Sequence, residues 1–300
     1  MADGTDGNSR AARAMEATPP EGAFVEVNGR RVHAVVRGQG PDLVLIHGAS
    51  GNARDFTFDL VARLESDFRI IAFDRPGMGW SDRQEEIEKS PQAQADVLRS
   101  AAAMLDVENP IVLGHSYGGA VALGWALRDP DNTAALVLLA PASHPWPGDL
   151  GVWYRLTASA PGRWLLLPLV SALAPTGRAE RVIENIFDPD PVPEGYAEHI
   201  GLNLTLRRSQ LAVNAIQVNS LREHVEVMQP GYADLSMPVE ILHGTADEVV
   251  GLSIHSERLA TEVPGANLVR LNGVGHMPHH AATDETLAAI HRAAKRAGLR

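Results

Sequence analysis

The chain has 300 residues, 45% hydrophobic and 21% charged, a composition typical of globular proteins with a large core. It has no cysteine, which excludes disulfides, thiolate zinc sites, iron–sulfur ligation and a cysteine nucleophile. With 26 basic and 37 acidic side chains its net charge is −11, which argues against electrostatic binding of nucleic acid or anionic lipid.

The first 22 residues are polar and small, without the apolar stretch of a secretory signal. We therefore expect residues 1–22 to form a disordered tail. The most apolar window, Trp164 to Ala174, is about half as long as a membrane span. The chain is accordingly expected to be cytoplasmic, with no membrane insertion.

Eight segments of the chain are predicted to form β-strands. The runs Ala23–Val27 and Arg31–Val36 flank Asn28-Gly29, which tolerates the positive φ angles of a tight hairpin turn. Six short apolar runs follow, and their lack of alternation is typical of parallel strands buried on both faces. These runs are Leu43–Ile46, Arg69–Phe73, Ile111–Leu113, Leu136–Leu139, Val239–Leu242 and Leu268–Leu271.

Helical patterns separate these apolar runs. One begins at Ser90-Pro91, a cap followed by proline, and another covers Gly119 to Arg128 and ends at Asp129-Pro130. This alternation predicts an α/β fold with a mostly parallel, doubly wound sheet. Between residues 143 and 237 proline and glycine punctuate short helical stretches. We interpret residues 143–237 as a helical cap inserted into a core made of residues 23–142 and 238–300.

The segment Leu113–Gly119 contains the pattern Gly-x-Ser-x-Gly, centred on Ser116. The pattern alone also occurs in ordinary glycine-rich turns. Here it follows a predicted buried strand and opens a predicted helix, the context in which a sharp turn projects a serine hydroxyl above a sheet. The helix N-terminus also favours negative charge at that point. Ser116 is therefore our candidate nucleophile.

With this motif in place, the chain resembles the α/β-hydrolase fold superfamily, in the branch with a serine nucleophile and a helical cap. The family places nucleophile, acid and base in that chain order. The loop Leu242–Asp247 resembles its acid loop, which implies Asp247 as the acid, and Gly273–His276 resembles its histidine loop, which implies His276 as the base. A serine needs such a base, and the imidazole in turn needs a carboxylate that fixes its tautomer.

Several of these residues have a competing interpretation. Asp247 alone could cap a helix over Val249–Leu259, but the segment after Leu136–Leu139 contains no competing carboxylate. His279 and His280 lie close enough to His276 to compete as the base. His115, His47 and His243 are interpreted as structural, and the spacing of the histidines at positions 199, 224 and 255 indicates no metal site. We expect neither a metal nor another cofactor.

The oxyanion hole is expected to use two backbone N–H groups. One belongs to Tyr117, the residue after the nucleophile. By resemblance the second belongs to Ala49, in the His-Gly-x loop after Leu43–Ile46. The loop Asp74–Ser81 also resembles a family loop, and we interpret it as structural turn residues with a charge pair between Asp74 and Arg75.

These residues predict a serine hydrolase that transfers an acyl group from a small, largely apolar ester-type substrate through an acyl-enzyme. Trp146, Trp153 and Trp164 are candidates to shape its pocket. One alternative is a carbon–carbon bond hydrolase of ring-fission diketones, which would use the same trio beneath a polar, anion-binding cap. Another is a small-molecule receptor without turnover. The sequence does not indicate an oligomeric state.

Overall fold

The computed structural model describes residues 5–85, 87–148 and 176–300. Eight strands form one sheet in the order β1-β2-β4-β3-β5-β6-β7-β8. β1 and β2 are antiparallel to their neighbours, and all other pairs are parallel. The strands are β1 (Ala23–Val27), β2 (Arg30–Arg37), β3 (Asp42–Ile46), β4 (Arg69–Phe73), β5 (Ile111–His115), β6 (Ala135–Leu139), β7 (Val239–Gly244) and β8 (Asn267–Leu271). All eight predicted strands are confirmed.

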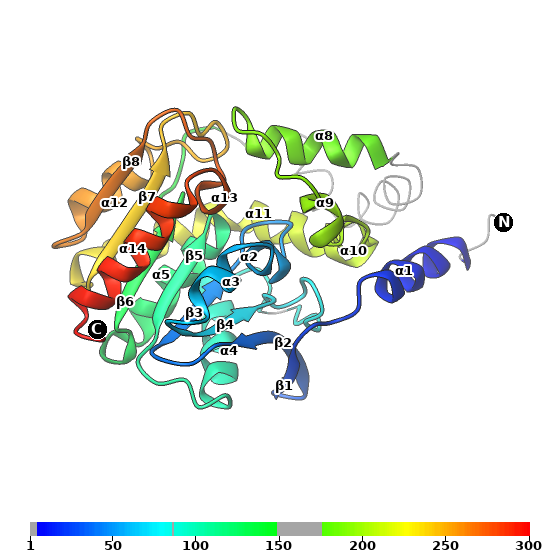
Figure 1. The fold of residues 1–300 in the computed structure, drawn as a ribbon, viewed down its shortest axis with the longest axis horizontal. Helices are drawn as coiled ribbons and strands as arrows, with labels where there is room; N and C mark the ends of the chain where they lie inside the picture. Colours follow the sequence, from blue (N-terminus) through cyan, green and yellow to red (C-terminus); the bar gives the residue numbers. More distant parts are fainter. Residues whose placement is uncertain (1–4, 86, 149–175) are drawn as a thin grey trace.

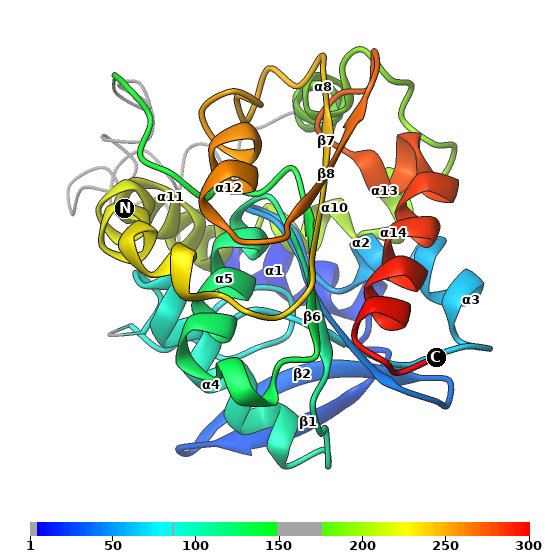
Figure 2. The same cartoon turned by 90° about the vertical axis from the view of Figure 1, so that its left-hand side faces the viewer.

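Helices cover both faces of the sheet (Figure 2). Figure 2 shows α4, α5 and α12 on one side, and α3 and α14 on the other. The core helices are α2 (Arg54–Thr57), α3 (Leu60–Leu64), α4 (Pro91–Ala103), α5 (Tyr117–Arg128), α12 (Ser256–Glu262), α13 (Pro278–Ala281) and α14 (Thr283–Arg296), with a short 3-10 helix, η1 (Pro130–Asn132).

The apolar runs belong to strands because each strand supplies side chains to two separate cores. In β3, Val44 and Ile46 enter the core beneath α4 and α5, whereas Leu43 and Leu45 enter the core beneath α3 and α14. Alternate side chains of a strand point to opposite faces, so a strand buried on both faces is apolar throughout. The predicted doubly wound α/β fold is confirmed.

Between β6 and β7, the structure describes residues 140–148 as irregular and residues 176–234 as mostly helical. The latter segment contains α8 (Thr176–Phe187), α9 (Tyr196–His199), α10 (Leu202–Thr205), α11 (Arg208–Met228) and the 3-10 helix η2 (Gln229–Asp234). In Figure 1, α8 and α9 lie on the side toward which the parallel strands point. None of the helices that the structure describes is long and apolar enough to cross a membrane.

The amino-terminal segment corrects one expectation. In place of a tail that is disordered over residues 1–22, α1 (Thr5–Ala17) is a helix and contacts α10. Alanine is the strongest helix former, and this segment is rich in it. The Ala14 side chain is buried and Thr18 packs against Gly201, so packing on the inserted helices adds to this local propensity.

Candidate active site

Ser116 stands at a strained turn between β5 and α5. Its backbone angles are φ 53° and ψ −117°, a region that side-chain-bearing residues rarely adopt. A Cβ atom on Gly114 would lie 2.2 Å from the Gly118 carbonyl oxygen, and one on Gly118 would lie 2.1 Å from the Ile46 carbonyl oxygen. The two glycines of the motif are therefore required by the close approach of backbone to backbone.

Three of the predicted site residues meet in one hydrogen-bonded chain. Ser116 Oγ lies 3.0 Å from His276 Nε2, and His276 Nδ1 lies 2.7 Å from Asp247 Oδ2. Because a carboxylate accepts only, Nδ1 carries the proton and Nε2 is free to accept from the serine hydroxyl. Ser116 follows β5, Asp247 follows β7 and His276 follows β8, so the carboxyl ends of three parallel strands bring the residues together.

The two oxygens of the Asp247 carboxylate have different hydrogen-bond partners. Oδ1 accepts the backbone N–H groups of Val249 and Val250, at 2.8 and 2.9 Å, while Oδ2 faces His276 and His243. Although burial opposes ionisation, the hydrogen bonds from His243 and His276 hold the pKa of Asp247 well below its ordinary value. The side chain is thus a fixed anion beside the His276 imidazole.

The helix considered after Asp247 begins later than Val249–Leu259. α12 starts at Ser256, and the residues before it form turns. One cause is His243, whose Nε2–H donates to the Val250 carbonyl oxygen at 2.9 Å and removes that carbonyl from a helical pattern. Asp247 therefore closes a turn through Oδ1 and caps no helix at this position, while its Oδ2 faces His276.

The neighbouring histidines have other partners. His115 Nε2–H donates to the His276 backbone carbonyl at 2.9 Å, so it anchors the histidine loop to the strand that carries the serine. His279 Nε2 lies 3.1 Å from Asp55 Oδ2, and His280 Nε2 lies 2.9 Å from Asp55 Oδ1. The geometry thus gives Ser116 His276 as its imidazole partner.

Asp55, His279 and His280 also form the one group within the described ranges whose donor atoms could together hold a metal ion. The carboxylate already accepts from both imidazoles and from the Tyr196 hydroxyl at 2.8 Å. Although burial opposes it, His279 and His280 hold the pKa of Asp55 well below normal, and burial lowers the pKa of His279. The Asp55 carboxylate thus has three hydrogen-bond donors.

A second serine, histidine and carboxylate are aligned elsewhere in the fold. Ser143 Oγ lies 2.8 Å from His144 Nδ1, and His144 Nε2 lies 2.9 Å from Glu262 Oε2. The exposed fraction of Ser143 is 0%, against 8% for Ser116. Ser143 also lacks a strained turn, so we interpret this array as a structural tie between β6 and α12.

The two expected oxyanion donors lie on either side of the elbow. A Cβ atom on Gly48 would lie only 3.2 Å from the Ser116 Cβ, so the loop that contains Ala49 passes directly beside the serine. Among the described residues, no group accepts a hydrogen bond from the backbone N–H of Ala49 or of Tyr117. Both groups are thus available to a substrate.

The loop after β4 differs from expectation. Asp74 and Arg75 do not form the expected charge pair: the Asp74 oxygens accept from His33 and from the backbone N–H groups of Ala53 and Trp80. The Arg75 side chain instead turns toward backbone carbonyl groups of the loop after β3. Adjacent residues in this turn point in different directions, which a sequence pattern alone does not reveal.

Sequence reasoning missed three further polar residues near the site: Arg75, Asn214 and Gln217. Asn214 Oδ1 accepts the Ser50 backbone N–H at 2.7 Å, and Gln217 Oε1 accepts from Arg75 at 2.6 Å. The two α11 residues are three positions apart and share one helix face. The available signal in the sequence was the row of polar side chains at positions 210, 214 and 217, which the structure shows to be buried.

Only one of the three candidate pocket tryptophans lies in the described part of the chain. Trp146 is half-buried against the core beneath α4 and α5, with its ring centroid 6.2 Å from that of His255. Trp153 and Trp164 fall outside the described residues.

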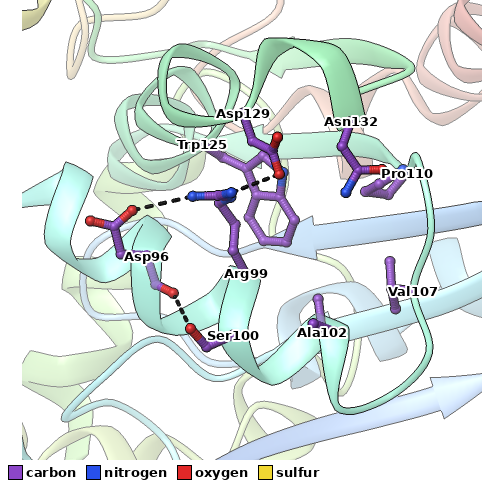
Figure 3. Close-up of a pocket in the computed structure, with 10 residues that line it drawn as sticks. Asp96, Arg99, Ser100, Ala102, Val107, Pro110, Trp125, Asp129 and Asn132 are labelled. Carbon is purple, nitrogen blue, oxygen red and sulfur yellow. Dashed lines mark hydrogen bonds and ion pairs between the residues drawn. The ribbon is translucent and has the colours of Figure 1, made fainter.

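A cavity of about 350 Å³ lies between α4 and α5 (Figure 3). It is lined by residues that include Arg99, Trp125 and Asp129, and Val107 and Pro110, which precede β5, also border it. It thus lies at the amino end of β5, opposite Ser116, and contains none of the predicted site residues. In Figure 3 the Arg99 guanidinium pairs with Asp129, which partly fills this space.

Comparison with known proteins identifies the family of this chain. The model of the alpha/beta hydrolase family matches residues 43–289. The chain belongs to the alpha/beta hydrolase family. An uncharacterised protein of Mycobacterium tuberculosis is 29% identical in an alignment of 281 positions that covers 88% of this chain and 78% of that protein.

Two solved structures share the fold of this chain. A thermophilic esterase from Thermogutta terrifontis has a TM-score of 0.72 and 21% identity, covering 91% of this chain and 97% of its own. The 2-hydroxy-6-oxo-6-phenylhexa-2,4-dienoate hydrolase from Rhodococcus sp. strain RHA1 has a TM-score of 0.73 and 20% identity, covering 91% and 99%. An esterase and a dienoate hydrolase therefore share this architecture.

Proposed function

We propose that this member of the family is a serine hydrolase that cleaves small, largely apolar esters through an acyl-enzyme, with Ser116, His276 and Asp247 as its catalytic residues. The observation that carries the proposal is the continuous hydrogen-bonded chain from the Ser116 hydroxyl to the Asp247 carboxylate, at 3.0 and 2.7 Å. The strained backbone of Ser116 supports it, because strain of this kind persists where it serves a reaction.

The chemistry follows from the tautomer of His276. Ser116 Oγ attacks the ester carbonyl as its proton moves to His276 Nε2, and the buried Asp247 anion stabilises the imidazolium that forms. The tetrahedral intermediate collapses, Nε2–H gives its proton to the leaving alcohol, and the acyl group remains on Ser116. Water then loses a proton to Nε2 and attacks the acyl-enzyme; as the bond to Ser116 Oγ breaks, Nε2–H returns the proton to Oγ and the acid is released.

The developing oxyanion needs donors on the face opposite the imidazole. The N–H groups of Tyr117 and Ala49 fill this role in the proposal, since both border Ser116 and neither has a described protein acceptor. The N-terminus of α5 adds its partial positive charge at the same point. Loss of one such donor typically costs about 3–4 kcal/mol of transition-state stabilisation.

A carbon–carbon bond hydrolase remains the second candidate, because the fold is shared with a ring-fission hydrolase as well as with an esterase. Both reactions use a serine trio, so the trio does not separate them. The two reactions can be separated with a panel of p-nitrophenyl esters, lactones, thioesters and ring-fission diketones. The proposal predicts the highest kcat/KM on an ester.

The test of the nucleophile is Ser116→Ala, assayed with p-nitrophenyl butyrate. We expect activity to fall by about 10⁴-fold or more, because the covalent step is lost. Ser143→Ala is the matched control: it removes a second buried serine that contacts a histidine, and it should retain activity within about threefold. Ser116→Ala activity within about tenfold of wild type, or equal losses in both variants, would contradict the assignment.

A further inference from the structure

Arg75 is a fully buried cation that pairs with no carboxylate among the residues that the structure describes. Its guanidinium donates to the backbone carbonyl oxygens of His47 and Gly48, at 3.0 and 2.9 Å, and to the side-chain oxygens of Gln94 and Gln217, at 2.9 and 2.6 Å. Burial lowers its pKa to about 10, so it is still charged near neutral pH. A buried charge held by neutral acceptors is costly, which indicates a use beyond packing.

The Arg75 guanidinium sets the direction of the peptide between Gly48 and Ala49. The C=O and N–H of a trans peptide point in opposite directions, so a Gly48 oxygen held toward Arg75 turns the Ala49 N–H away from it. The same segment lies against the elbow, since a Gly48 Cβ would lie 3.2 Å from the Ser116 Cβ.

His47 holds the same carbonyl from a second direction. Its Nε2 accepts the Arg75 backbone N–H at 3.0 Å, which leaves the proton on Nδ1, and Nδ1–H donates to the Gly48 oxygen at 2.8 Å. Burial and the nearby Arg75 charge lower the pKa of His47 to about 3, so this imidazole is neutral. The Gly51 backbone N–H also donates to the Gly48 oxygen, at 3.3 Å, so this carbonyl has three donors, of which only Arg75 is cationic.

The same cation contacts the second oxyanion residue and the cap. The guanidinium carbon lies 4.4 Å from the centroid of the Tyr117 ring, and the Tyr117 hydroxyl accepts from Gln94. Gln217 joins Arg75 to the Pro76 carbonyl, and Asn214 holds the Ser50 N–H, so α11 closes the polar shell around the oxyanion loop.

We infer that Arg75 is the positioning residue of the oxyanion hole: it fixes the Gly48 carbonyl so that the Ala49 N–H faces the oxyanion that forms on Ser116, with α11 of the cap completing its hydrogen bonds. A cation on the carbonyl end of a peptide also makes the N–H end a stronger donor. Arg75 touches no substrate and acts through the peptide. This inference rests on the proposed serine hydrolase function.

The test compares Arg75→Met, Arg75→Lys and Arg69→Met in the full-length chain with a p-nitrophenyl ester. Arg69 is the matched control, because it also holds two backbone carbonyls, of Leu105 and Asp106, but at the amino end of β4. We expect kcat to fall about 100-fold in Arg75→Met and about tenfold in Arg75→Lys, with KM within threefold of wild type. Arg69→Met should keep the wild-type kcat.

A boronic acid inhibitor gives a second readout, since its tetrahedral adduct needs the oxyanion hole and product alcohol does not. In the variants with a lower kcat, the Kd of the boronic acid should rise, while the Kd of the product alcohol should stay unchanged. If Arg75→Met does not fold, Arg75→Lys decides by the same two readouts. The inference is overturned if a folded Arg75 variant keeps kcat within twofold, or if kcat, KM and alcohol binding all weaken together. If wild type shows no Ser116-dependent hydrolysis, the proposed function itself fails.

Discussion

At the scale of single residues, Asp247 shows how one side chain serves both fold and site. Its Oδ1 closes a turn through two backbone N–H groups, and its Oδ2 holds the Nδ1–H of His276. The turn holds the carboxylate in place, and the carboxylate fixes the tautomer of the imidazole. The two roles can be separated by a substitution that keeps the shape of the side chain.

Asp247→Asn is that substitution. An asparagine can place its oxygen toward the Val249 and Val250 N–H groups, which leaves its NH₂ group facing His276 Nδ1 and stabilises the wrong tautomer. We expect kcat to fall by about 10⁴-fold and the midpoint of urea unfolding to fall modestly, because the NH₂ group cannot accept from His243 Nε2–H. Steady-state kinetics and urea titration measure both quantities. An active variant would place the acid elsewhere in the fold.

At the scale of elements, local signals were sufficient for the strands and for the elbow. Asn28 and Gly29 have the positive φ angles that the hairpin turn demands, and Ser90 caps α4 by accepting the Ala93 N–H, as its sequence predicts. These features depend on neighbours in sequence. The contacts of Arg75 with the loop after β3 and with α11 join residues 27 and 142 positions apart, so no local pattern contains them.

The carboxyl edge of the sheet also contains a pH-sensitive hydrogen-bonded contact. His255, just before α12, accepts the backbone N–H groups of Ser143 and His144 on Nδ1, both at 3.1 Å. Burial, and then the nearby histidines, lower its pKa to about 3. Protonation of Nδ1 would replace these two hydrogen bonds with repulsion, so the folded chain requires the neutral imidazole.

This pKa shift predicts a loss of stability in acid. The unfolded histidine binds a proton below about pH 6.5 and the folded one only near pH 3, so stability is complete above pH 6.5 and is lost as the pH falls toward 3. His255 alone should cost about 2 kcal/mol at pH 5. His255→Asn, whose side-chain oxygen can accept the same N–H groups, should reduce the fall in unfolding free energy between pH 7 and 5. Parallel curves for the two proteins would contradict this role.

At the scale of the whole molecule, the residues of the candidate site lie at the carboxyl edge of the sheet, and the inserted helices cover this edge. The Asp190 carboxylate accepts the Gly275 N–H of the histidine loop at 2.7 Å, and Asn214 holds the oxyanion loop from the other direction. The trio was predictable because each member stands in a recognisable loop. The helical packing of α1 on the insertion was not, because it depends on contacts far apart in the chain.

The central claim is that Ser116 is a nucleophile activated by His276, and a fluorophosphonate tests it most directly. Intact-protein mass spectrometry should show one covalent adduct per chain, assigned to Ser116 by peptide mapping. The adduct should be absent in Ser116→Ala and should form at least about 100-fold more slowly in His276→Gln, because the general base is lost. No adduct on the wild-type protein, or an undiminished adduct on Ser116→Ala, would contradict the account.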